Sequence, residues 1–151
     1  MTVEPAFAGP PHIRHGAQDE LHAWFTDPPG AVLQLSKPQR ATVEQARWLV
    51  GPAIELLRAR FPSEEKVILV LDYRNMTSRD TSARTLMMEH AGEIAHMFSH
   101  VYIVPPLQAN PVYRSALHAA IALVSVFGSP LEIVETLDEV IAKQSLRALR
   151  G

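Results

Sequence analysis

The sequence contains no cysteine, which excludes disulfides, thiolate zinc sites and a cysteine nucleophile. Its 14 basic and 16 acidic residues leave a formal charge of −2, so nothing electrostatic indicates nucleic acid or an anionic membrane surface as a partner. The longest apolar stretch, residues 116–127, is too short to cross a bilayer. A secretory signal, with its basic start and apolar run, is not visible. We therefore expect a cytoplasmic protein with no membrane span.

Motifs that carry enzyme chemistry are also missing. The sequence has no Gly-x-Gly-x-x-Gly, no P-loop and no Gly-x-Ser-x-Gly, so neither nucleotide chemistry nor hydrolase chemistry is indicated. Glu93 and His96 have the Glu-x-x-His spacing of di-iron sites, but such sites require a second pair in a helix bundle. We predict a non-enzymatic protein with no cofactor and no metal.

The composition is that of one globular domain. The chain has 151 residues, of which 47% are hydrophobic and 20% charged, and this length is enough to bury a core without crosslinks. Residues 1–19 contain Pro5, Pro10 and Pro11 without any periodicity. They predict a flexible N-terminal arm, with the folded domain at residues 20–151.

The pattern of apolar residues predicts alternating strands and helices. Residues 21–26 and 31–35 flank a Pro-Pro-Gly turn, which indicates an antiparallel hairpin whose first strand lies at a sheet edge. A helix begins after Thr42, with Gln45 as its capping-box partner, and Pro52 should kink it. The later strands and helices are predicted at residues 67–71, 81–98, 100–104, 111–127, 131–134 and 137–146.

The predicted order is β-β-α-β-α-β-α-β-α. Alternation with short loops indicates a single α/β domain with a mainly parallel sheet of four or five strands. The N-terminal hairpin adds an antiparallel part to that sheet. The unbroken apolar run at residues 67–71 is typical of a strand that is buried on both faces, so it should lie at the centre.

Charged and polar side chains gather where this central strand ends. In an open α/β sheet, binding sites form at the carboxyl ends of the strands. A polar loop and the start of a helix follow here, so we expect these residues to bind a partner or an anion. The candidates are Asp72, Tyr73, Arg74, Asn75, Arg79, Asp80 and Arg84.

Two hydroxyl residues, Thr81 and Ser82, lie at the beginning of the helix. One interpretation is helix capping, with Asp80 as the N-cap and Thr77 with Asp80 as a capping box. The other is that a hydroxyl accepts a phosphoryl group. A phosphate at a helix N-terminus meets free backbone N–H groups and the positive end of the helix dipole. Arg79 and Arg84 are nearby in the sequence and could pair with it.

This stretch also resembles a known signature. The residues Val70-Leu71-Asp72, Thr77 and Asp80-Thr81-Ser82-Ala83 are similar to the motif of STAS domains, the fold of bacterial anti-sigma-factor antagonists. The order of elements is similar as well, so the resemblance covers about residues 20–146. It is closest to divergent STAS-like proteins grouped with the sporulation antagonist and with lipid-binding CRAL-TRIO domains.

The resemblance implies a regulatory signalling module of bacterial type, with a protein partner such as a regulator or a kinase. In that family the Ser after the Asp is phosphorylated by a partner kinase. Thr81 occupies this position here, with Ser82 beside it. The chain departs from the motif in two ways, because Thr81 replaces Ser and Ala83 replaces the usual Gly.

Two other hypotheses come from the residues alone. The helix at residues 111–127 is nearly all apolar, so together with Pro105-Pro106-Leu107 it could wall a pocket for a lipid or small apolar ligand. It could equally form a homodimer interface, with Arg114 and His118 in its narrow polar stripe. Trp48 is either an exposed anchor for a partner or a ring folded over neighbouring side chains.

Overall fold

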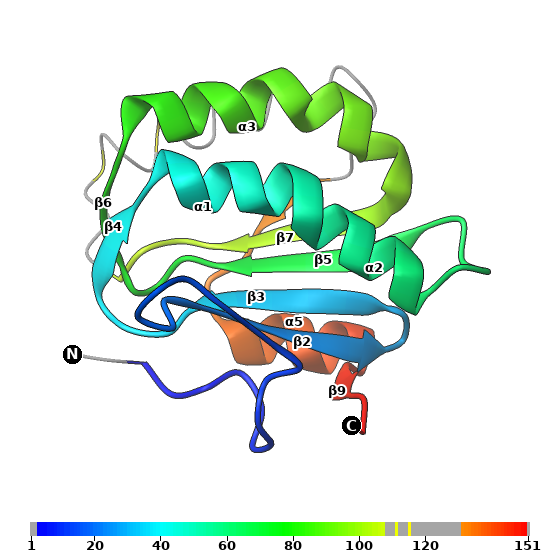
Figure 1. Ribbon diagram of the computed structural model, residues 1–151. Coiled ribbons are helices and arrows are strands. Elements are labelled where there is room, and N and C mark those ends of the chain that lie inside the picture. The colour runs from blue at the N-terminus through cyan, green and yellow to red at the C-terminus, as the bar shows by residue number, and fades with distance from the viewer. Residues whose placement is uncertain (1–2, 108–110, 112–114, 116–130, 151) are drawn as a thin grey trace.

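The computed structural model describes the chain except residues 1–2, 108–110, 112–114, 116–130 and 151. Figure 1 shows one twisted sheet with α1, α2 and α3 on one face and α5 on the other. The α/β architecture that the sequence predicts is confirmed. None of the described helices is both long and apolar enough to cross a membrane.

The main sheet has the described order β1-β2-β3-β5-β7-β8, and β9 also pairs with β2. The run β3-β5-β7-β8 is parallel, and β1, β3 and β9 are antiparallel to β2. These strands are β1 Ile13–His15, β2 Leu21–Asp27, β3 Gly30–Leu35, β5 Val67–Asp72, β7 Phe98–Val104, β8 Leu131–Ile133 and β9 Arg147–Ala148. A separate parallel pair, which the sequence did not predict, consists of β4 Gln39–Ala41 and β6 Met76–Arg79.

The first helical segment follows the sequence pattern closely. Thr42 caps α1 (Val43–Trp48) through the predicted capping box with Gln45. A π-helical turn at Leu49–Ala53 contains Pro52 and leads into α2 (Ile54–Arg60). Proline lacks an N–H and its ring crowds the carbonyl four residues earlier, which explains a widened turn here. The other described helices are α3 (Thr81–Ile94), a 3₁₀ turn at Ala95–Met97 and α5 (Leu137–Gln144).

Both faces of the sheet are buried. On one face, side chains of β3, β5 and β7 pack against α1 and α2, with the core residues Leu33, Leu49, Ile54, Leu57, Leu69, Leu71, Val101 and Ile103. On the other face, the same strands pack against α5, with the core residues Val32, Val70, Tyr102, Val104, Leu137 and Val140. This double burial is why β5 is apolar without alternation.

Two predictions about the N-terminal part are wrong. Residues 1–19 were expected to hold no regular element, but β1 forms there and pairs with β2 in the register Ile13↔Ala23. β2 was expected at a sheet edge, but β1 and β9 both bond to its outer side. The physical reason is that the outward N–H and C=O groups of β2 need partners, and short segments from both chain ends supply them.

Candidate functional site

The carboxylate of Asp72, at the end of β5, is fully buried. Arg74 binds it in a bidentate manner, with Nε 2.9 Å from Oδ1 and Nη2 2.7 Å from Oδ2. The backbone N–H of Arg74 and the amide Nε2 of Gln34 also donate to it, at 3.1 and 2.8 Å. Asp72 therefore has a complete set of internal partners, and it organises the loop.

The pair has an electrostatic consequence for Arg74. Hydrogen bonding to the Asp72 carboxylate, with its negative charge, raises the pKa of the Arg74 guanidinium above its ordinary value, although partial burial opposes this. Arg74 stays charged at every accessible pH, so the buried carboxylate always has its counter-ion.

Gln34 is a site residue that sequence reasoning missed. It is a buried polar residue in the otherwise apolar strand β3, and the strand register places it beside Asp72. Besides donating to Asp72, its side chain donates to Glu4 O and accepts from Ala6 N, at 3.0 and 3.1 Å. The available signal was a single amide in an apolar strand, because such a group needs a polar partner nearby.

The next two loop residues are also engaged. The Tyr73 N–H donates to Val104 O at 2.9 Å, which extends the pairing of β5 with β7. Asn75 is buried, and its Nδ2 donates to Leu35 O at 2.9 Å. Of the predicted partner- or anion-binding residues, Asp72, Tyr73, Arg74 and Asn75 thus hold the loop in place.

Asp80 occupies the N-cap position of α3 but makes no side-chain cap there. Its Oδ2 accepts from Val43 N, the first amide of α1, at 3.2 Å, and its Oδ1 accepts from Arg40 Nε at 2.5 Å. Thr77 lies in β6, so the predicted capping box of Thr77 with Asp80 is wrong. Asp80 instead serves the neighbouring helix, where a negative charge is favourable.

Thr81 and Ser82 are both exposed at the first turn of α3. The carbonyl of Thr81 accepts from Thr85 Oγ at 3.2 Å. Since Asp80 is directed to α1, no side chain of the described residues caps the first amides of this helix. The amides of Ala83 and Arg84 donate to Asp80 O, at 3.1 and 3.4 Å, so the exposed hydroxyls lie beside the amides of Thr81 and Ser82.

Trp48 lies half-buried on the sheet side of α1. The ring of His15 stacks on it, with centroids 4.4 Å apart and an angle of 12°. One face of the indole is therefore covered by the protein's own chain. The other predicted interface residues, Arg114 and His118, lie outside the described residues.

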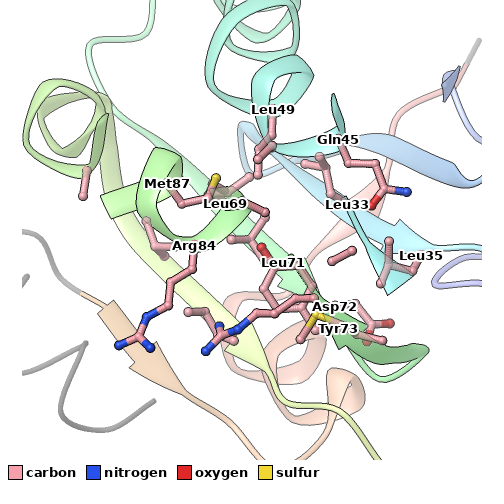
Figure 2. Close-up of a pocket in the computed structure, with 18 of the residues that line it drawn as sticks. Leu33, Leu35, Gln45, Leu49, Leu69, Leu71, Asp72, Tyr73, Arg84 and Met87 are labelled. Atoms are coloured by element: carbon pink, nitrogen blue, oxygen red, sulfur yellow. The ribbon is translucent and has the colours of Figure 1, made fainter. Parts of the chain in front are cut away.

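An apolar cavity of about 230 Å³ lies between the sheet and helices α1 and α3 (Figure 2). Leu33, Leu69 and Leu71 form its floor, and Leu49 and Met87 lie above them. The space exists because small residues line the helices, namely Ala46 on α1, Ala83 and Ala91 on α3, and Ala95 in the 3₁₀ turn.

Polar side chains line only part of this cavity, and among the described residues they are Thr42, Gln45, Asp72, Tyr73, Arg79 and Arg84. Gln45 is committed to the capping box and to Gln39 Oε1, at 2.9 Å. Figure 2 shows Arg84 extending from α3 away from the leucines. Arg84 has no ion pair within the described part of the chain.

The cavity is large enough to admit a small apolar molecule. A cavity of about 150 Å³ lined by aliphatic side chains and Phe binds benzene, and this one measures about 230 Å³.

A second hollow, more polar than the first, lies between α2 and the end of α3. Its lining includes Arg58, Glu64, Glu65, Glu93 and His96. Among the described residues, no group of three or more acidic or histidine side chains could hold a metal ion.

Comparison with known proteins identifies the fold. No protein-family model and no curated protein matches the sequence. The chain is similar to the crystal structure of an uncharacterized protein of the DUF3478 family from Shewanella loihica, which is described as having a SpoIIAA-like fold. The TM-score is 0.52 at 10% sequence identity, over 76% of this chain and 82% of that one. The protein therefore has a divergent SpoIIAA-like fold, the fold of STAS domains and anti-sigma-factor antagonists.

Proposed function

We propose that the protein is a non-enzymatic regulatory module that binds a protein partner through the start of α3. Phosphorylation of Thr81 or Ser82 would switch this binding. The supporting observation is that both hydroxyls are exposed at a helix N-terminus whose N-cap carboxylate bonds to another helix. The SpoIIAA-like fold is compatible with this role but does not identify a partner.

The chemistry of this helix start suits a phosphate. A phosphorylated hydroxyl adds about −1.5 to −2 charges and three acceptor oxygens. At Thr81 or Ser82 the phosphate would lie beside the backbone N–H groups of these two residues and the positive end of the helix dipole. Arg84 lies one turn further along the helix from Thr81, at a spacing where side chains interact.

The test compares the natural protein with two variants in the native cell. Mass spectrometry should find phosphate on Thr81 or Ser82 of the natural protein. The Thr81→Ala, Ser82→Ala double variant should lose phosphorylation-dependent partner binding in a pull-down, and Thr85→Ala, an exposed threonine one turn away, is the matched control. A double variant that carries no phosphate and keeps every partner of the natural protein would contradict the switch.

A second candidate function is binding of a lipid or small apolar ligand, and the cavity supports it. Its described walls are α1, α3 and the sheet, and Pro105, Pro106 and Leu107 are not among them. Native mass spectrometry of the purified protein should show bound mass that solvent extraction removes. A protein that carries no extractable compound and binds no added apolar compound would contradict this function. Light scattering would reveal the remaining alternative, a homodimer without a switch.

A further inference from the structure

We propose that the cavity under α3 binds a small amphipathic anion, a free aliphatic monocarboxylate, whose head is recognised by Arg84. This inference rests on the ligand-binding function proposed above and adds the chemical class of the ligand.

The walls select an aliphatic tail. Leu33, Leu49, Leu69, Leu71 and Met87 surround the interior. They offer no hydrogen-bond donor or acceptor, so a polar group placed among them would lose its hydration without compensation. The adaptable thioether of Met87 can pack against a chain of variable shape.

The edge of the cavity selects a negative head. Of the charged residues that line it, Asp72 is neutralised by the bidentate Arg74 and Arg79 already has an interaction within the chain. Arg84 is therefore the cation that can receive a ligand. A guanidinium presents a planar fork of donors that matches the two oxygens of a carboxylate. Arg84 is exposed and lies where the apolar lining ends, so it can hold a head group while the tail is buried.

The volume sets the length of the tail. The cavity of about 230 Å³ is about one and a half times the size of one that holds benzene, so it suits roughly eight to ten non-hydrogen atoms. A straight-chain carboxylate of roughly eight carbons has both the negative head and a tail of this length. Sodium octanoate is therefore the probe.

Isothermal titration calorimetry of the full chain would compare octanoate with 1-octanol, which has the same tail and no charge, and with acetate, which has no tail. We expect octanoate to bind about tenfold more tightly than octanol, because a charge-assisted hydrogen bond contributes about that factor. Acetate should give no detectable heat. The Arg84→Gln variant should lose this tenfold preference and bind octanol as the natural protein does, and the control is Arg47→Gln, on the exposed side of α1.

The outcomes separate the inference from the function on which it rests. Equal binding of octanol and octanoate, or an octanoate affinity that Arg84→Gln leaves unchanged, would overturn the carboxylate assignment while leaving an apolar site. Failure of both octanol and octanoate to bind would overturn the ligand-binding function as well. Ala91→Leu, which places a larger side chain in the cavity lining, should weaken both ligands together. If it weakens neither, they bind elsewhere and the assignment is wrong.

Discussion

Replacing Arg74 by methionine should destabilise the domain far more than replacing an exposed arginine. The substitution removes both guanidinium hydrogen bonds to Asp72 but keeps an apolar stem of similar length. The Asp72 carboxylate stays buried, with the Arg74 backbone N–H and Gln34 as its remaining donors. Removing one partner of a buried ion pair costs about 3–5 kcal/mol, because the other charge is left without compensation.

Two features place the expected loss at or below the lower limit of that range. The side chain of Arg74 is 22% exposed, so solvent screens part of the interaction, and two donors to Asp72 remain. We expect a loss of about 2–3 kcal/mol in the free energy of unfolding. For a domain of this length, that corresponds to a decrease in Tm of roughly 5–10 °C.

Urea unfolding followed by circular dichroism measures this loss, and an unchanged m-value shows that the two-state comparison is valid. The control is Arg147→Met, because Arg147 pairs with Asp27 at the surface and should contribute less than about 1 kcal/mol. In a double-mutant cycle with Asp72→Asn, the double variant should lose about 1–3 kcal/mol less than the sum of the losses in the two single variants. A loss at Arg74 no larger than at Arg147, or strict additivity, would refute the role assigned to this pair.

Four further substitutions test individual contacts. Gly30→Ala should cost about 1–3 kcal/mol in urea unfolding, because its Cβ would lie 2.3 Å from a backbone oxygen of β5. Gly92→Ala, whose Cβ meets nothing within 4 Å, should instead stabilise α3 by about 0.5–1 kcal/mol. Asp80→Ala should cost about 1 kcal/mol in the same assay, since it removes the acceptor for the first amide of α1. An unchanged free energy of unfolding would show that this hydrogen bond is dispensable. The hydrogen bond from His22 holds the pKa of Asp19 below its ordinary value. Ionised Asp19 therefore stabilises the folded state at pH values above its ordinary pKa, and this stabilisation is lost as the pH falls through the lowered pKa. His22→Ala should raise the Asp19 pKa in an NMR carboxyl titration, and an unchanged pKa would contradict the assignment.

The alternation of strands and helices could be predicted from the sequence because burial determines it locally. A strand covered on both faces must be apolar throughout, which is why Val67 to Leu71 identified the central strand. The capping box of Thr42 with Gln45 was equally predictable, because its two partners are only three residues apart. The motif after the central strand led to the same SpoIIAA-like fold that the structural comparison shows.

The candidate site was only partly predictable, because its contacts join segments distant in sequence. Nothing local to Asp80 indicates that its carboxylate bonds to residues 37 and 40 positions earlier. The same holds for Gln34, which lies 38 positions from Asp72. Sequence reasoning could name the charged residues after the central strand, but it could not show that Arg74 holds the loop through Asp72 or that Arg79 and Arg84 line a cavity.

The sequence by itself determined the fold class, the central strand and the start of α1, since periodicity and capping act within one element. The tertiary structure alone decided that β1 and β9 cover β2, that Asp72 is neutralised inside the domain, and that an apolar cavity lies under α3. The physical reason is that strand pairing, charge compensation and empty volume depend on which elements meet. Small residues such as Ala83 leave a cavity only where a second helix and a sheet fail to fill the space beside them.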